Sequence, residues 1–250
     1  MSFLAAVQFL TSLPVKKDFT PGQLGHASAW FPAVGLGLGL VLAGLNWLLG
    51  LILPAGVVNA LLIVALVGLT GALHLDGLAD TCDGLAGYRT VEERWQVMRD
   101  SRTGAFGAVG IVLLLLVKYV SLNAVPPSLM TATLIFFPVA SRWAMVYAVF
   151  AYRYARPSGL GTAFKQATRW PQFTVATVIM LAAATLMYPF FWLTGFFIIG
   201  GTWVITVLLS LYLKHKFAGL TGDTYGAINE VAEVTVLLLA VLVSNNIGAV

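Results

Sequence analysis

The sequence predicts an all-α, polytopic integral membrane protein, a helix bundle with about seven transmembrane helices. Of its 250 residues, 59% are hydrophobic and only 10% are charged. A soluble domain carries roughly a quarter charged residues, because its surface must be covered with polar groups. Several apolar stretches also approach the about 20 residues that a helix needs to cross a bilayer. These observations favour a membrane bundle over a soluble globule.

Seven apolar stretches are the expected spans. In chain order they are 29–53, 55–73, 105–125, 128–152, 173–190, 192–213 and 227–246. The first two and the fifth and sixth are nearly continuous, so a count of six or eight stays open. Without a convincing internal repeat, residues 1–250 are expected to form a single membrane domain. Within it, 1–28 is expected to be a cytoplasmic or interfacial segment and 74–104 a cytoplasmic acidic region.

Charge placement predicts the topology. The N-terminal segment and alternate connections carry these basic residues: Lys16, Lys17, Arg89, Arg94, Arg99, Arg102, Arg153, Arg156, Lys165, Arg169, Lys214 and Lys216. The connections near Pro54, Pro126 and Pro189 carry no charge. By the positive-inside rule, the N-terminus and the acidic region are expected to face the cytoplasm. The expected location is the inner (cytoplasmic) cell membrane. The net charge of +4 reflects this topology, and no nucleic-acid partner is expected.

Three carboxylates in the region 74–84 are the strongest chemical signal. Asp76, Asp80 and Asp83 stand four and three residues apart, a spacing that puts them on one face of a helix. Like charges this close require protonation, a basic partner or a divalent cation. The sequence therefore predicts a metal site, and oxygen ligands favour Mg²⁺ or Mn²⁺ over zinc.

A second polar group opens the third span. Asp100, Ser101 and Arg102 precede Gly104 and Gly107. Arg102 and the first amides of the following helix are suited to hold an anion such as phosphate. The alternative is a helix cap with an arginine that faces lipid headgroups. The glycines of stretches 35–39 and 104–110 are expected to let helices approach closely.

A third polar group enters the last span. Asn229, Glu230 and Glu233 begin an apolar helix, and carboxylates there are costly and seldom without function. The alternative is a pair of structural ion pairs with Arg142 or Lys214. Arg142 is expected to face the bundle interior, roughly 13 Å from the end of its span at about 1.5 Å per residue.

Three other residues are expected to have no catalytic function. Lys118 lies near the outer end of its span, where its long side chain can reach water. His74 is expected to be structural, with support of the metal ligands as the alternative. Cys82, the sole cysteine, cannot form a disulfide within the chain and is expected to fill space.

Four segments together resemble the adenosylcobinamide-GDP ribazoletransferases, also called cobalamin synthases. In order they are FLTSLPV at 9–15, GALHLDGLADTCDG at 71–84, DSRTGAFG at 100–107 and GLTGDTYGAINE at 219–230. The resemblance runs from end to end of the chain. Cys82 departs from it, because a small residue such as alanine is expected there.

The resemblance implies a membrane transferase for a late step of cobalamin biosynthesis, the assembly of the nucleotide loop. Such an enzyme joins adenosylcobinamide-GDP to α-ribazole or its 5′-phosphate and releases GMP, with Mg²⁺ required. The ribose 3′-hydroxyl of α-ribazole is expected to attack the phosphate next to the cobinamide. A homo-oligomer or association with other enzymes of this pathway stays open.

This reaction assigns roles to the polar residues. A metal held by carboxylates, cationic donors and a base are the parts that it needs. We expect Mg²⁺ to be bound by Asp76, Asp80 and Asp83. Arg102 is expected to stabilise the negative charge of the phosphate, with Lys165 or Arg142 as further donors. The candidate base is Asp83 or Glu230. The expected substrate and cofactor contacts are Asp100, Asp223, Asn229 and Glu233.

Other functional classes remain alternatives. A CDP-alcohol type lipid phosphotransferase is the nearest, because Asp80 to Gly84 partly matches the Asp-x-x-Asp-Gly signature of those enzymes. The downstream aspartates of that signature are missing here. A cation-coupled transporter should instead show paired broken helices near the bilayer midplane. A purely structural membrane protein has no need of these acidic residues.

Overall fold

The computed structural model describes residues 1–15, 17–87, 90–100, 102–156 and 160–247. Lys16 and Arg89 of the basic pattern and Ser101 of the third-span motif lie outside these residues. The long helices are α3 (Phe31–Gly50), α4 (Ala55–Thr70), α7 (Ala105–Ala124), α8 (Pro127–Ala151), α10 (Trp170–Phe191), α11 (Gly195–Phe217) and α12 (Gly222–Ile247). The shorter helices are α1 (Ser2–Leu10), α2 (Pro21–His26), η1 (Ala27–Trp30), α5 (Leu73–Leu85), α6 (Val91–Val97), α9 (Leu160–Ala167) and η2 (Trp192–Thr194).

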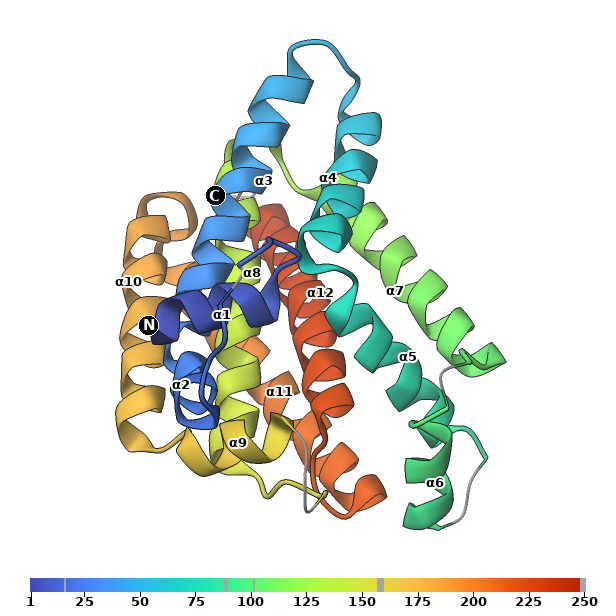
Figure 1. The fold of residues 1–250 in the computed structure, drawn as a ribbon. Helices are drawn as coiled ribbons and strands as arrows, with labels where there is room; N and C mark the ends of the chain where they lie inside the picture. The colour runs from blue at the N-terminus through green and yellow to red at the C-terminus, as the bar shows by residue number, and fades with distance from the viewer. Residues whose placement is uncertain (16, 88–89, 101, 157–159, 248–250) are drawn as a thin grey trace.

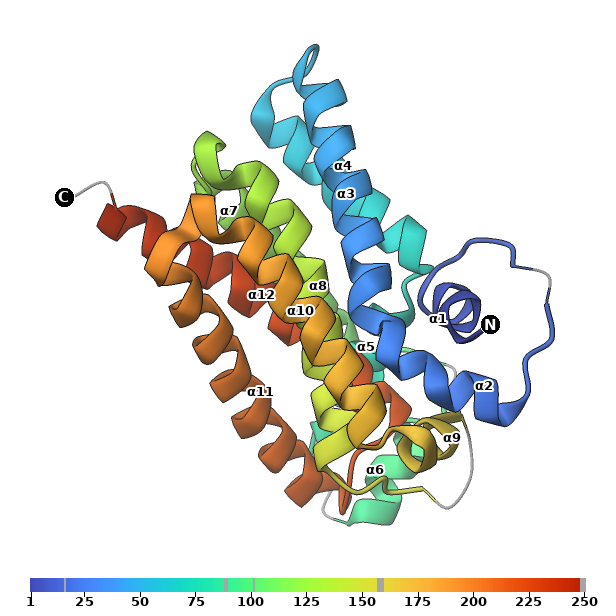
Figure 2. The ribbon, with the colours of Figure 1, turned by 90° about the vertical axis from the view of Figure 1, so that its left-hand side faces the viewer.

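The predicted all-α membrane bundle is confirmed (Figure 1). Five helical stretches are long and apolar enough to cross a membrane, or six if the bent pair α4 and α5 counts as one more span. One stretch, Trp170–Phe217, contains both α10 and α11, which turn back on each other through η2 (Figure 2). The seven expected segments thus correspond to seven long helices among the described residues. The number of crossings and the side of the N-terminus stay predictions.

Helix α8 is the centre of the bundle. It packs against α3, α10, α11 and α12, and most of its side chains are buried. The predicted close approach at the glycines of α3 is confirmed, because a Cβ at Gly35 would collide with the Pro138 carbonyl and one at Gly39 with Ile135. With no side chain between them, α3 and α8 touch backbone to backbone.

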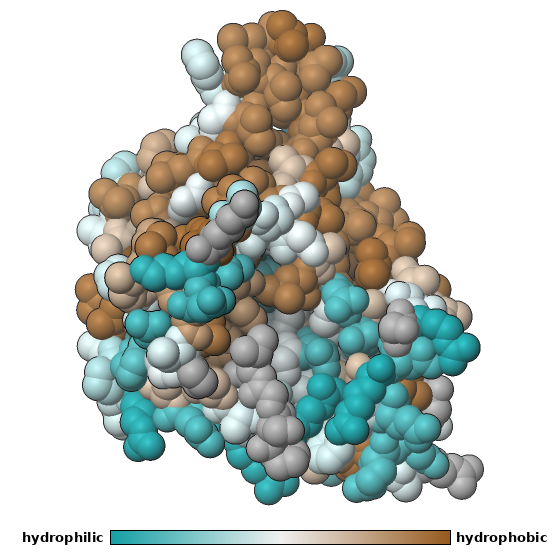
Figure 3. Space-filling model, viewed as in Figure 1, coloured by the Kyte–Doolittle hydropathy of each residue, from teal (hydrophilic) through white to brown (hydrophobic). Residues whose placement is uncertain are grey.

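The surface separates into two zones. Hydrophobic side chains cover the upper part of the molecule, including the hairpin of α3 and α4, and hydrophilic side chains gather at the lower end (Figure 3). Apolar surface is stable in lipid, whereas charged side chains need water or headgroups. The molecule therefore presents one strongly polar end, at which α6 and α9 lie (Figure 1).

A sharp corner joins α4 to α5 and directs the acidic residues. The two helices meet at 90°, and the corner residues Gly71 and Ala72 both have left-handed backbone angles, with φ of 59° and 58°. Ser12 fastens this corner, since its backbone N–H donates to the Leu69 carbonyl at 2.8 Å and its hydroxyl to the Gly68 carbonyl at 2.7 Å. These bonds satisfy carbonyls that a helix end leaves free. The segment 9–15 thus holds the end of α4 from which α5 departs.

The contact between α3 and α8 predicts that alanine substitutions at two glycines of α3 have different effects on stability. Gly35→Ala should lower the free energy of unfolding by about 1–3 kcal/mol, because the added methyl group overpacks against the α8 backbone. The measurement is thermal unfolding in detergent. Gly37→Ala is the matched control, since a Cβ there meets no atom within 4 Å and alanine favours the helix. Equal stability of the two variants would contradict the observed packing.

Candidate active site

Helices α5 and α12 cross at glycines, and this crossing assembles the candidate site. A Cβ on Gly77 would lie 2.7 Å from the Asp223 carbonyl oxygen, and one on Gly226 would lie 3.1 Å from the His74 carbonyl oxygen. The two backbones therefore meet without intervening side chains. This contact brings the α5 carboxylates beside Asp223, at the start of α12.

Four aspartates form the acidic set, which we define as Asp76, Asp80, Asp83 and Asp223. Asp80 interacts electrostatically with the other three and with Arg156. The Arg156 guanidinium lies 3.0 Å from an Asp223 carboxylate oxygen. The prediction that the α5 aspartates lie on a helix is confirmed. Among the described residues no three acidic, histidine or cysteine side chains converge closely enough to hold a metal ion, so the metal site stays a prediction.

Asp83 is bound by the start of α7. Its two carboxylate oxygens accept hydrogen bonds from the backbone N–H groups of Gly104 at 2.7 Å and Gly107 at 2.8 Å. The glycines are required, because a Cβ at either position would collide with the Asp83 carboxylate. These amides were expected to hold a substrate phosphate, but the anion that they hold in this structure is Asp83.

Arg102 and Asp100 pair on the surface beside this helix start. The Arg102 guanidinium donates to both Asp100 oxygens, at 3.0 and 2.7 Å, and this bonding lowers the pKa of Asp100 to about 2. The two residues border a hollow of about 430 Å³ that Asp83 also lines. Arg102 is therefore an exposed cation at the edge of the acidic set, and its contact with phosphate stays a prediction.

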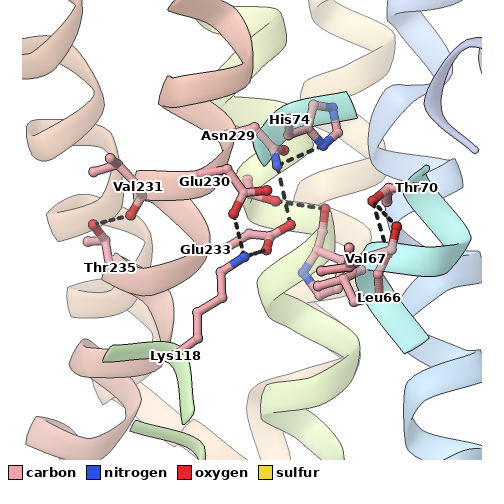
Figure 4. Close-up of polar contacts among 12 residues, drawn as sticks. Leu66, Val67, Thr70, His74, Lys118, Asn229, Glu230, Val231, Glu233 and Thr235 are labelled. Carbon is pink, nitrogen blue, oxygen red and sulfur yellow. Dashed lines mark hydrogen bonds and ion pairs between the residues drawn. The ribbon is translucent and has the colours of Figure 1, made fainter. Parts of the chain in front are cut away.

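The glutamates of α12 belong to a buried ion network (Figure 4). The Lys118 ammonium lies 2.6 Å from a Glu230 oxygen and 2.5 Å from a Glu233 oxygen. Glu233 also pairs with Arg142, which is fully buried on α8. The alternative of structural ion pairs is thus correct for Arg142, but the second partner is Lys118 and not Lys214. Arg142 and Glu230 are thus both engaged in this network, and their expected catalytic roles stay predictions.

The expectation that Lys118 extends to water is wrong. Its side chain is only 4% exposed, because its face of α7 packs against α12. Sequence position near the end of a span indicated a long side chain reaching water, whereas the tertiary structure provides two carboxylates closer by. A buried ammonium is stable when carboxylates pair with it, and removal of either partner would leave an uncompensated charge inside the bundle.

Asn229 connects this network to His74. Its side-chain nitrogen lies 3.3 Å from a Glu233 carboxylate oxygen and 3.2 Å from His74 Nδ1 (Figure 4). Asn229 and Glu233 were expected to contact substrate or cofactor, yet both are fully buried. Their expected contact with substrate or cofactor stays a prediction.

Lys165 lies on α9 and bonds to the end of α8. Its ammonium donates to the carbonyls of Val149 at 3.0 Å and Phe150 at 2.8 Å, at the end of α8. Partial burial lowers the pKa of Lys165. A cation at the last carbonyls of a helix stabilises that helix end, so the structure gives Lys165 a structural contact and its predicted contact with phosphate stays untested.

A cavity of about 190 Å³, the α5–α12 cavity, opens beside the acidic set. Asp76 and Asp223 line it together with His74 and Tyr225. Sequence reasoning missed Tyr225 as well as Arg156, the cation paired with Asp223. Arg156 and its partner are 67 residues apart, so no local pattern announced the pair.

The ion network predicts a large cost for removing its lysine. Lys118→Met should destabilise the protein by about 3–5 kcal/mol, because Glu230 is left buried without a cation. Adding Glu230→Gln should recover much of the loss, since Glu233 then remains paired with Arg142. The measurement is unfolding in detergent, with exposed Lys214→Met as the control. A Lys118 variant as stable as this control would contradict the network.

Comparison with known proteins gives a consistent result. Residues 2–241 match the family described as cobalamin-5-phosphate synthase. The adenosylcobinamide-GDP ribazoletransferase of Geotalea daltonii is 39% identical over 96% of this chain and 97% of its own length. Proteins of the same name from Desulforamulus reducens and Roseiflexus are each 36% identical, over 96% and 93% of this chain.

No solved structure matches the chain. The sequence relatives nevertheless cover it from end to end, and the helical bundle with its acidic crossing agrees with an integral membrane transferase. The chain belongs to the cobalamin-5-phosphate synthase family.

Proposed function

We propose that this chain joins adenosylcobinamide-GDP to α-ribazole or its 5′-phosphate, giving adenosylcobalamin or its 5′-phosphate and GMP. The observation that carries the proposal is the acidic set at the crossing of α5 and α12, which borders a cavity in a chain of this family. The whole chain acts as a single membrane transferase domain. The protein lies in the inner cell membrane, and its polar end faces the cytoplasm.

The reaction is a displacement at phosphorus. The ribose 3′-hydroxyl of α-ribazole forms a new P–O bond to the phosphate next to the cobinamide, and the P–O bond to GMP breaks. GMP leaves with the electron pair of that bond, and the hydroxyl proton passes to a carboxylate. Glu230 does not fit as this base, because it pairs with Lys118 inside the bundle. The base therefore belongs to the acidic set.

The donor chemistry of the acidic set fits a divalent cation. Asp80 interacts electrostatically with the other three aspartates, and the cation that pairs with this set is Arg156, through Asp223. Mg²⁺, with Mn²⁺ as an alternative, would be held by Asp76, Asp80 and Asp223, because the Asp83 oxygens already accept hydrogen bonds from the α7 amides. A cation bound there would supply positive charge against the transferring and leaving oxygens. Arg156 and Arg102 supply further positive charge for the phosphates.

A lipid headgroup phosphotransferase is the competing function, because the same carboxylates would serve a lipid acceptor. The leaving nucleotide separates the two. Release of GMP from adenosylcobinamide-GDP supports the proposal, and release of CMP from a CDP-activated lipid substrate would replace it.

The first prediction of this proposal is metal-dependent release of GMP. Purified protein in lipid should form GMP and a corrinoid product from adenosylcobinamide-GDP and α-ribazole 5′-phosphate when Mg²⁺ is present. Chelation of the metal should stop both products. Folded protein that forms neither, with both substrates verified, would exclude the proposed activity.

The second prediction concerns Asp80. Asp80→Asn should lower GMP release by about 100-fold or more, because the amide keeps the shape of the side chain but loses the charge that binds the cation. Unfolding in detergent should be little changed. The control is Asp18→Asn, which changes an exposed carboxylate outside the site. Normal turnover by the Asp80 variant would remove this residue from the metal site.

A further inference from the structure

His74 presents one ring nitrogen for which the described residues offer no partner. The residue is 2% exposed, and its Nε2 is buried without a hydrogen bond. The residue lines the α5–α12 cavity. A buried polar atom without a partner is costly, about 1–3 kcal/mol, so this atom indicates that a bound molecule supplies the missing bond.

The neighbours of His74 decide which kind of partner it needs. Glu233 is a carboxylate and only accepts, so Asn229 must turn its NH₂ group toward it. The same nitrogen lies 3.2 Å from His74 Nδ1, which therefore accepts the second N–H. A neutral imidazole that accepts at Nδ1 carries its proton on Nε2. His74 thus offers an N–H donor, and its partner must be an acceptor.

The rest of the cavity wall favours a flat aromatic ligand. Phe9, Phe31 and Phe164 line it and contact one another, with ring centroids 4.7–5.8 Å apart. Aromatic rings pack well against such faces. The volume of about 190 Å³ exceeds the about 150 Å³ of an apolar cavity known to bind benzene, which suits a bicyclic ring.

A second unsatisfied group borders the same cavity. The Tyr225 hydroxyl is buried without a hydrogen bond among the described residues, and Tyr225 lines the wall. Two buried polar atoms without partners beside one aromatic cavity are more than packing requires. The ligand that fits is a planar bicyclic ring with at least one polar atom on its edge.

We propose that the α5–α12 cavity holds the heteroaromatic base of the acceptor nucleoside, with His74 Nε2–H donating to the free ring nitrogen of that base. The proposal rests on the proposed function, in which the acceptor α-ribazole carries a benzimidazole. One benzimidazole nitrogen bears the ribose, and the other has a lone pair in the ring plane. His74 is the residue that recognises this lone pair.

The position of the cavity agrees with the chemistry of transfer. Asp76 and Asp223 belong both to its wall and to the acidic set. A nucleoside whose base fills the cavity therefore places its ribose next to the carboxylates. The attacking hydroxyl is then held where a base and a cation are available, which is the geometry that a displacement requires.

The test compares two ring systems of equal shape. We expect purified protein in lipid nanodiscs to bind 1-methylbenzimidazole about fivefold to tenfold more tightly than 1-methylindole, in which a C–H replaces the ring nitrogen. The measurement is competition against α-ribazole by ligand-observed NMR, without the GDP substrate. Equal affinity of the two probes would overturn the proposal. So would binding of neither probe, the result expected if a lipid chain fills the cavity.

Two variants of His74 give a matched comparison. His74→Phe keeps a ring but removes the donor, so the preference for 1-methylbenzimidazole should disappear while 1-methylindole binds as before. His74→Gln places an amide N–H near the position of Nε2, so it should retain most of the preference. Each variant is first shown to unfold cooperatively. A preference that survives His74→Phe would exclude His74 as the donor.

The outcome is separable from that of the proposed function. Probe binding is measured without turnover, whereas the proposed function is measured by release of GMP. Normal GMP release with no discrimination between the probes would overturn only the assignment of the cavity. Discrimination between the probes without GMP release would leave the base subsite in place and overturn the proposed reaction.

Discussion

The buried ion network of Lys118, Glu230, Glu233 and Arg142 is the constraint on which the rest of the bundle depends. It joins one side chain from α7 and one from α8 to two from α12. Charges inside an apolar bundle are stable only when each has its counter-charge in hydrogen-bonding distance. The network therefore sets the rotation of α12 against both neighbours, which apolar packing alone specifies less sharply.

The same network orients the candidate site. Glu233 turns the Asn229 amide, and Asn229 in turn engages Nδ1 of His74 at the wall of the α5–α12 cavity. A structural ion pair in the bundle interior is thus connected, through Asn229, to a residue of the cavity wall. The glycines at the crossing of α5 and α12 complete the arrangement, because they bring the acidic set to the edge of the same cavity.

Segments far apart in the chain hold α5 at both ends. Ser12 fastens the corner that precedes α5, and the first amides of α7 bind Asp83 near its end. Carboxylates that lie close together on one helix repel one another, so contacts at both ends of α5 help to hold it in place. The motifs at 9–15 and 100–107 are thus explained by their contacts with this corner and with Asp83.

The sequence by itself determined the helical membrane fold, the approximate helix limits and the helix face shared by Asp76, Asp80 and Asp83. These follow from hydrophobic stretches and from spacing along one helix, which are local properties. The sequence also indicated, as an alternative, that Arg142 forms a structural ion pair. Only the tertiary structure decided that Lys118 is buried, that the α7 amides hold Asp83, and that His74 lines a cavity. Each of these depends on a partner far along the chain, and helix packing, which no local pattern encodes, brings that partner into contact.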